Sequence, residues 1–142
     1  MLASQILSEK GDLVFTVSPH ETVAQAATLL HERKVGAMVV VNQNDAVVGI
    51  LSERDVVRVV AQQGPQGLHK SVATCMTMDV IFALPGETVD ALLGRMTDRR
   101  VRHLPVLNKG RLAGLISIGD LVKRKIAETE AEAETLKAYI AT

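Results

Sequence analysis

The chain has 142 residues, of which 47% are hydrophobic and only 2% aromatic, so it is long enough for one domain or two small subdomains with an aliphatic core. Sixteen Lys and Arg residues balance 16 Asp and Glu residues, which excludes a global field that would draw the chain to nucleic acid or to an anionic membrane. With one cysteine, Cys75, and no apolar run near the roughly 20 residues of a membrane helix, we expect a cytoplasmic protein.

Much of the sequence occurs twice. The segment ETVAQAATLLHERKVGAMVVV at residues 21 to 41 corresponds to ETVDALLGRMTDRRVRHLPVL at residues 87 to 107. The phrase GILSERD at residues 49 to 55 corresponds in the same way to GLISIGD at residues 114 to 120. An internal repeat of this length indicates two copies of one supersecondary unit, each too small to be stable alone.

Both copies predict the same order of elements. A short apolar strand, at residues 15 to 17 and 80 to 83, ends before a proline that favours a turn. Apolar residues at helical spacing follow Thr22 and Thr88, which stand at N-cap positions. Two β-rich runs then form a hairpin, and a second helix starts directly after the repeated phrase. We therefore expect an α/β (α+β) fold of two βαββα units packed as a pseudo-twofold pair.

Shorter segments surround the two copies. LASQIL at residues 2 to 7 resembles SVATCM at residues 71 to 76, and we expect a brief helix in each. GPQGLHK, with two glycines and a proline, is the predicted linker. We place the first repeat, with the N-terminal segment, at residues 1–66, the second repeat at residues 67–128 and a C-terminal helical extension at residues 129–142.

Two interpretations of the phrase G-x-x-S-x-x-D stay open. Serine ahead of a helix, with an acid at the third helical position, is typical of a capping box, so Ser52 with Asp55 and Ser117 with Asp120 can be structural pairs. The same geometry suits a ligand, because a helix N-terminus attracts anions and a carboxylate there accepts bonds from the paired hydroxyls of ribose. In that case the glycine ahead of the helix lets a ligand approach the backbone.

Basic residues precede the HLPVL strand of the second copy. Arg102 and His103 stand at the strand entrance, near the start of the phrase helix, and arginine pairs bidentately with phosphate. We favour a phosphate-contacting role for these two residues. Arg99 and Arg100 we interpret as a solvated helix end, where basic residues favour the helix dipole.

The repeated phrase, together with the strands VGAMVVV and VRHLPVL, closely resembles a tandem pair of cystathionine β-synthase (CBS) domains over nearly the whole chain. The resemblance implies a freestanding Bateman module whose clefts bind adenine nucleotides or related adenosyl compounds. It assigns ribose to Asp55 and Asp120. The residues it places at ribose or phosphate are Ser52, Arg54, Asp55, Arg102, His103, Ser117, Ile118 and Asp120. Those it places around adenine are Phe15, Thr16, Val17, Gly36, Ala37, Met38, Val80, Ile81, Phe82, Leu104 and Pro105.

The two copies differ at the strand entrance, where the first has GAM and the second has RHL. The first copy therefore contributes no basic group from that strand. One site that draws its phosphate contacts from the second copy is as well supported as two equal sites.

Catalytic and metal-ligating patterns are missing from the sequence. The four histidines are scattered, with His31 expected on the polar side of a helix, and none has metal-ligand spacing to Cys75. Cys75 itself is interpreted as a small buried hydrophobe. We expect neither a metal site nor a catalytic cofactor, and we expect that the protein is not an enzyme.

The C-terminal segment predicts a long helix with one apolar stripe. The stripe recurs at alternating spacings of four and three: Val122, Ile126, Thr129, Ala133, Leu136 and Ile140. It either covers the core of its own module or forms a short coiled seam between two chains. The resemblance to CBS pairs implies a homodimer.

The leading functional hypothesis is an energy or redox sensor. It would bind AMP, ADP, ATP, NAD or a related adenosyl ligand and signal to a protein partner, without nucleic acid or membrane. The alternative is a ligand-free structural or interaction dimer in which the S-x-x-D phrases only cap helices.

Overall fold

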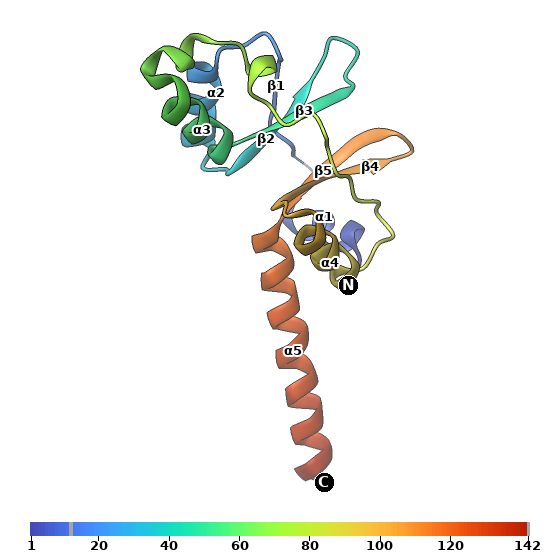
Figure 1. Ribbon diagram of the computed structural model, residues 1–142. Coiled ribbons are helices and arrows are strands. Elements are labelled where there is room, and N and C mark those ends of the chain that lie inside the picture. Colours follow the sequence, from blue (N-terminus) through green and yellow to red (C-terminus); the bar gives the residue numbers. More distant parts are fainter. Residues whose placement is uncertain (12, 142) are drawn as a thin grey trace. The chain divides into compact units, whose positions relative to one another are not determined.

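The computed structural model describes residues 1–11 and 13–141 and divides the chain into two compact units (Figure 1). The first-repeat unit is Leu13–Val80, and the second-repeat unit combines Met1–Asp12 with Ile81–Thr142. These divisions differ from those expected from the sequence. The N-terminal segment belongs with the second repeat, and residues 67 to 80 belong with the first.

The first-repeat unit contains a three-stranded sheet in the order β1-β2-β3. β1 is parallel to β2, and β2 is antiparallel to β3. The helix α2 begins after Thr22, whose hydroxyl accepts from the backbone N–H of Gln25, so the predicted N-cap is confirmed. The Gln25 side chain accepts in turn from the backbone N–H of Thr22, which completes a capping box. The elements are β1 (Thr16–Val17), α2 (Val23–Arg33), β2 (Ala37–Val41), β3 (Val47–Ser52), α3 (Glu53–Gln63) and the 3-10 helices η1 (Gly64–His69) and η2 (Val72–Thr74).

The predicted linker GPQGLHK is not a linker. It forms η1, which packs against α2 and α3, and its Gly67 is buried beside Val59. The proline stands at the start of this short helix, where its missing N–H costs nothing. The turn-forming composition therefore marks a tight helical turn within the first-repeat unit.

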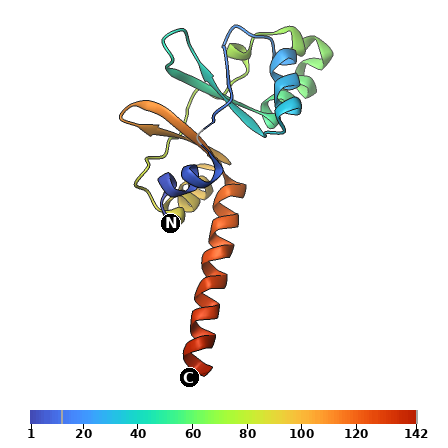
Figure 2. The same ribbon diagram turned by 180° about the vertical axis from the view of Figure 1, so that it is seen from behind.

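The second-repeat unit has a two-stranded antiparallel sheet of β4 and β5. Thr88 caps α4 by accepting from the backbone N–H of Ala91 at 3.1 Å, as predicted. The helix after the second phrase and the C-terminal extension form one continuous helix of 24 residues, which extends beyond the rest of its unit (Figures 1 and 2). The elements are α1 (Ala3–Lys10), α4 (Val89–Arg99), β4 (His103–Asn108), β5 (Arg111–Ser117) and α5 (Ile118–Ala141).

The strand predicted at residues 80 to 83 is reduced to a single bridge between Ala83 and Val106. In the first copy, the backbone N–H of Val39 donates to the carbonyl of Phe15 and helps to join β1 to β2. The equivalent residue in the second copy is Pro105, which has no N–H to donate. The parallel ladder therefore keeps only the bonds made by Ala83.

The two similar segments at residues 2 to 7 and 71 to 76 are here called the crossing segments. The segment that precedes the first repeat packs on the second repeat, and the segment that precedes the second repeat packs on the first. Ala3 and Ile6 of α1 are buried in the core of the second-repeat unit. Val72 and Cys75 take the same positions in the core of the first-repeat unit. The brief helices expected there are confirmed as α1 and η2.

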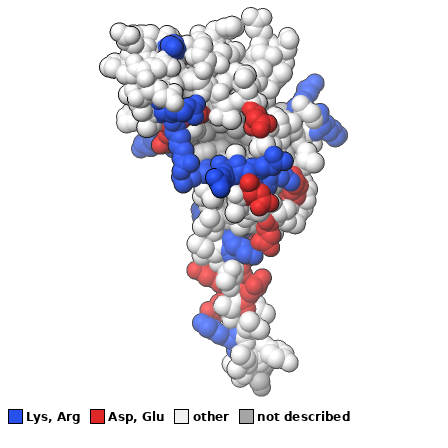
Figure 3. Space-filling model, viewed as in Figure 1, with Lys and Arg blue, Asp and Glu red and all other residues white. Residues whose placement is uncertain are grey.

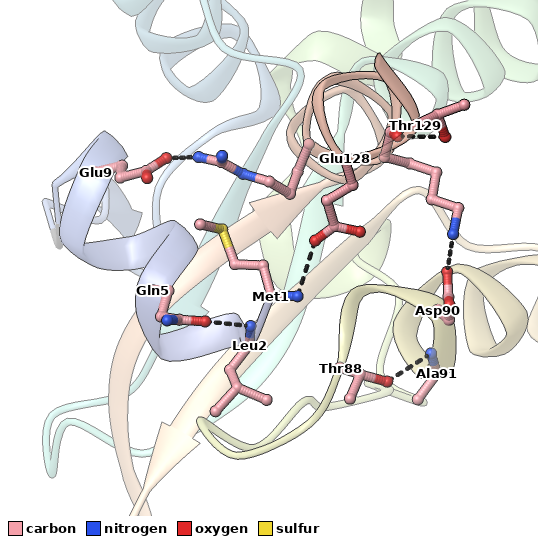
Figure 4. Close-up of polar contacts among 11 residues, drawn as sticks. Met1, Leu2, Gln5, Glu9, Thr88, Asp90, Ala91, Glu128 and Thr129 are labelled. Atoms are coloured by element: carbon pink, nitrogen blue, oxygen red, sulfur yellow. Dashed lines mark hydrogen bonds and ion pairs between the residues drawn. The ribbon is translucent and has the colours of Figure 1, made fainter. Parts of the chain in front are cut away.

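Backbone hydrogen bonds fix both crossing segments in equivalent ways. The N–H of Ala3 donates to the carbonyl of Glu87 at 2.9 Å, and the N–H of Val72 donates to that of Glu21 at 2.7 Å. Figure 4 shows the further contacts at the N-terminus, where the amino group of Met1 lies 2.8 Å from Glu128 of α5. Each repeat therefore completes its core with a segment that lies outside the repeat itself.

The first glycine of each repeated phrase makes room for a crossing segment. A Cβ at Gly114 would lie 2.5 Å from a methyl carbon of Leu7, and one at Gly49 would lie 2.6 Å from the sulfur of Met76. The same Cβ at Gly49 would also lie 2.9 Å from the carbonyl oxygen of Thr77. The expectation that these glycines admit a ligand to the backbone is wrong, because side chains of the protein itself fill the space.

No helix within residues 1–11 and 13–141 combines the length and apolar character needed to cross a membrane.

We expect Gly49→Ala to lower the free energy of unfolding by about 1–3 kcal/mol, because the added methyl group overpacks the contact with Met76 and the backbone of Thr77. Urea unfolding followed by circular dichroism measures this change. The matched control is Gly94→Ala in α4, where no atom lies within 4 Å of the new Cβ. Because alanine favours a helix interior, this control should gain about 0.5–1 kcal/mol. Equal stabilities for the two variants would contradict the proposed packing role.

Candidate functional site

The hairpin of each unit brings its strand entrance next to the repeated phrase. Ala37 lies opposite Ser52 in the first-repeat unit, and His103 lies opposite Ser117 in the second-repeat unit. The backbone N–H of Ile118 also donates to the carbonyl of Arg102 at 2.8 Å. The basic pair at the entrance of β4 therefore lies beside the start of α5.

Asp55 of the first-repeat unit is buried, with 3% of its surface exposed. Its Oδ2 accepts from the backbone N–H of Ser52 at 2.9 Å and from the Ser52 hydroxyl at 3.1 Å, and the Ser52 Oγ accepts from the Asp55 N–H. Its Oδ1 lies 2.9 Å from the guanidinium of Arg58 and 3.5 Å from the hydroxyl of Thr77. Both carboxylate oxygens are thus engaged by groups of the same unit.

Asp120 of the second-repeat unit is more accessible, with 24% of its side chain exposed. Its Oδ2 accepts from the backbone N–H of Ser117 at 2.9 Å, and the Ser117 Oγ accepts from the Asp120 N–H at 3.2 Å. The same Oδ2 lies 2.7 Å from Nζ of Lys10, which also donates to the carbonyl of Leu115 at 2.8 Å. The crossing helix α1 therefore supplies a counter-ion to the phrase aspartate.

The pKa of Asp120 reflects these opposing effects. Burial raises it, but the hydrogen bond from Lys10, the Ser117 backbone bond and the charge of Lys10 together lower it below its ordinary value. The carboxylate is therefore the stable form at neutral pH, as both helix capping and hydroxyl binding require.

Both phrases have the reciprocal bonds of a capping box. The side-chain and backbone bonds between serine and aspartate are present at the starts of α3 and α5. The capping interpretation is therefore confirmed as geometry. Capping does not exclude a ligand. The two phrase aspartates lie in different surroundings, and Asp120 stays partly exposed while Asp55 is buried.

Most predicted ligand-contacting residues lie at or near the surface of their own units. Arg54 and Arg102 are exposed, and 39% of Ile118 is exposed. Thr16 is also exposed, whereas Phe15, Gly36, Val80, Ile81 and Phe82 are half-buried. The remaining residues of the predicted adenine set are buried: Val17, Ala37, Met38, Leu104 and Pro105.

Three features reduce the number of groups in the predicted adenine set that are available to a ligand. Met38 and Leu104 are fully buried in the cores of their units, so their side chains serve packing. The carbonyl of Phe82 already accepts from Nη1 of Arg95 at 2.9 Å. The ring of Phe15 carries the guanidinium of Arg33 at 4.3 Å from its centroid, a cation–π contact.

Sequence reasoning missed Lys10, Arg58 and Thr77 as partners of the phrase aspartates. Arg58 lies three residues after Asp55, so helical spacing provides a signal for that pair. Lys10 and Thr77 come from the crossing segments or the residues just after them. No spacing in the sequence shows that α1 packs on the second repeat.

Cys75 behaves as the buried hydrophobe that its sequence context predicts. It is 7% exposed, and burial, with a smaller contribution from Asp55, raises the pKa of its thiol. A protonated, enclosed thiol is a poor nucleophile. Within the described part of the chain, no group of three or more His, Cys, Asp or Glu residues could hold a metal ion.

A surface hollow of about 240 Å³ lies elsewhere in the first-repeat unit. Its lining residues are Ser18, Pro19, His20, Asn42, Gln43 and Asn44. None of them belongs to the predicted ribose, phosphate or adenine sets.

Comparison with known proteins agrees with the doubled architecture. The sequence matches the CBS domain family twice, over residues 11–62 and 70–126. The chain belongs to the CBS domain family. The crystal structure of the CBS-domain containing protein ATU1752 from Agrobacterium tumefaciens is 44% identical, with a TM-score of 0.85, over 87% of this chain and 92% of that one.

Two further CBS proteins are similar to this chain over most of its length. The CBS domain protein PAE2072 from Pyrobaculum aerophilum, solved in complex with AMP, is 28% identical with a TM-score of 0.76, over 84% of this chain and 89% of that one. The mitochondrial CBS domain-containing protein CBSX3 of Arabidopsis thaliana is 36% identical over 84% of this chain. This chain spans 60% of the length of the Arabidopsis protein.

Replacing Lys10 with methionine should raise the pKa of Asp120, because the hydrogen bond and charge that lower it are removed. Since the folded-state pKa lies below the unfolded one, the pair contributes stability above the ordinary pKa, and this is lost as pH falls through the lowered value. The stability advantage of the wild type over Lys10→Met should therefore shrink on acidification below about pH 4. Carboxyl NMR titration and unfolding at several pH values measure both effects. Lys70→Met, in the other unit, is the control, and an unchanged Asp120 titration in Lys10→Met would disprove the contact.

Proposed function

We propose that this CBS pair is a regulatory module that binds an adenosine-containing ligand, such as AMP, ADP, ATP or NAD, and signals to a partner protein. The observation that carries the proposal is the β4-β5 register, which sets His103 opposite Ser117 and so places a basic strand entrance beside a capped helix start. A carboxylate for ribose hydroxyls and cations for phosphate then lie within one unit.

The second-repeat unit is the better candidate for the principal ligand site. Lys10 and the Ser117 N–H both contact Oδ2 of Asp120, and 24% of this side chain is exposed, so we assign the ribose hydroxyls to this carboxylate. Asp55 has both oxygens engaged and is nearly enclosed. The first copy also has Gly36 where the second has Arg102. We therefore propose one principal phosphate-contacting site rather than two equal ones.

The relatives support the ligand class. PAE2072 was crystallised with AMP, and its fold covers most of this chain. AMP offers the two groups that the second-repeat residues suit, a ribose diol for Asp120 and a phosphate for Arg102. We also propose that the module senses the ligand and does not convert it. Binding would shift the population of conformational states by no more than the difference in the ligand's affinity for those states. We also propose that the protein forms a homodimer and is cytoplasmic.

The alternative function is a structural or interaction dimer, and the observed capping boxes favour it. Ser52 with Asp55 and Ser117 with Asp120 already satisfy the helix starts without any ligand. In that case, conservative changes to the basic strand entrance would have no effect on ligand binding, because no ligand would bind.

Calorimetry with AMP and adenosine tests the proposed role of Arg102. We expect Arg102→Ala to weaken AMP binding by roughly 10-fold or more, because a charge-assisted hydrogen bond of about 1.5–3 kcal/mol is lost. Adenosine, which has no phosphate, should bind wild type and variant equally. Arg99→Ala, an exposed arginine at the end of α4, is the matched control and should bind AMP normally. Equal loss with AMP and adenosine would overturn the phosphate role.

A thermal-shift series with AMP, ADP, ATP, NAD, S-adenosylmethionine and a GTP control separates the two functions. A ligand that binds only the folded state stabilises by about 2.7 kcal/mol at 100 times its dissociation constant. An adenine-specific rise in Tm that is lost in Asp120→Ala supports the sensor. No rise with any adenine compound at millimolar concentration supports the structural dimer.

A further inference from the structure

The C-terminal half of α5 is exposed along its whole described length. Only Leu121 of this helix is buried, and every residue from 129 to 141 is exposed. Most helical stability in proteins comes from packing, so this part of α5 gains little stability from contacts with its own unit.

The apolar stripe of α5 lies on a different side of the helix from the residues that face its own unit. Arg124 pairs with Glu9 of α1, Lys125 lies 2.9 Å from Asp90 of α4, and Glu128 holds the amino group of Met1 (Figure 4). The stripe is left open. The exposed fractions are 43% for Val122, 54% for Ile126, 62% for Leu136 and 80% for Ile140.

The stripe has the heptad spacing of a short coiled coil. Its spacing assigns Val122, Thr129 and Leu136 to d positions and the alternating residues to a positions. The a positions are Ile126, Ala133 and Ile140. Isoleucine at two a positions and leucine at one d position match the combination that favours two parallel strands, whereas Ala133 and the β-branched residues Val122 and Thr129 do not add to that preference.

The charges beside the stripe select the orientation of the two helices. In a parallel pair, each g position meets the e position five residues later on the other helix. Lys125 would then meet Glu130 of a second copy, and Glu132 would meet Lys137, so both contacts join opposite charges. Figure 3 shows basic and acidic side chains succeeding one another along the extended part of the helix.

An antiparallel pair would bring like charges together. In that arrangement e positions meet e positions and g positions meet g positions. With the stripes matched end to end, Lys123 would face Lys137, and Glu130 and Glu132 would each face their own copies. The existing contacts do not compete strongly with the parallel arrangement. Lys125 with Asp90 and Lys137 with Glu134 are exposed pairs, which contribute little.

We propose that the stripe of α5 binds α5 of a second copy of this chain as a short parallel coiled coil. This inference rests on the homodimer proposed above and specifies the surface and the orientation. The two modules of the dimer would then lie at the same end of the coil.

Disulfide trapping with a matched pair of variants tests the proposal. Ala133 occupies an a position, whereas Ala131 lies on the outer face, and both are exposed in the single chain. Under mild oxidation, Ala133→Cys should form a covalent dimer and Ala131→Cys should not. Of these two positions, only residue 133 would face residue 133 of the second chain across the seam. The wild type, whose Cys75 is buried, is the background control.

Sedimentation equilibrium gives an independent measure of the seam. Leu136→Asp should weaken association at least 10-fold without lowering the Tm of the module, since 62% of Leu136 is exposed in the single chain. Ala138→Asp adds the same charge on the outer face of the same helix and should leave association unchanged. A Leu136→Asp variant that associates like Ala138→Asp would overturn the proposal.

The outcomes separate this inference from the homodimer itself. A monomeric wild type would overturn both. A dimer in which Ala133→Cys forms no disulfide would overturn the coiled coil and leave the homodimer intact. A disulfide between Thr129→Cys and Ala133→Cys chains, without Ala133→Cys self-trapping, would show antiparallel helices and overturn the parallel orientation.

Discussion

The fold depends on the exchange of the two crossing segments between the repeats. Each repeat alone has a small sheet and two helices, and its core is completed by a helical segment from elsewhere in the sequence. The exchange explains the first glycine of each repeated phrase, since Gly49 and Gly114 lie where Met76 and Leu7 pack. The first-repeat unit closes its core with the segment that follows α3, whereas the second-repeat unit needs α1 from the start of the chain.

The same exchange makes the two phrase aspartates unequal. α1 brings Lys10 to Asp120, whereas Asp55 is surrounded by Arg58 and Thr77. One carboxylate is half-open with a cation at one oxygen, and the other is enclosed with both oxygens engaged. The two phrases share their first glycine, their serine and their aspartate, so part of the difference comes from the segments packed against them, which supply Lys10 to one aspartate and Thr77 to the other. Two copies of one sequence pattern thus place their phrase aspartates in chemically different surroundings.

In the proposed function, the atoms that cap the helices are also the atoms that would contact the ligand. The capping boxes at the starts of α3 and α5 orient serine and aspartate, and the hairpin register sets the strand entrance beside them. A ligand that used Asp120 would meet an arrangement already held in place by the cap. Capping and binding therefore do not compete as explanations, and the energetic effect of a ligand is what distinguishes them.

The sequence by itself determined the repeat, the order of the helices and hairpins, the N-caps at Thr22 and Thr88, and the capping phrases, because these depend on periodicity and on residues three or four positions apart. It also indicated the stripe of α5. Only the tertiary structure decided that α1 packs on the second repeat, that Lys10 meets Asp120, and that the strand at residues 80 to 83 is reduced to one bridge. These depend on contacts between residues far apart in the chain, such as Pro105 with Ala83. Local patterns carry no information about which remote segment fills a core, whereas packing does.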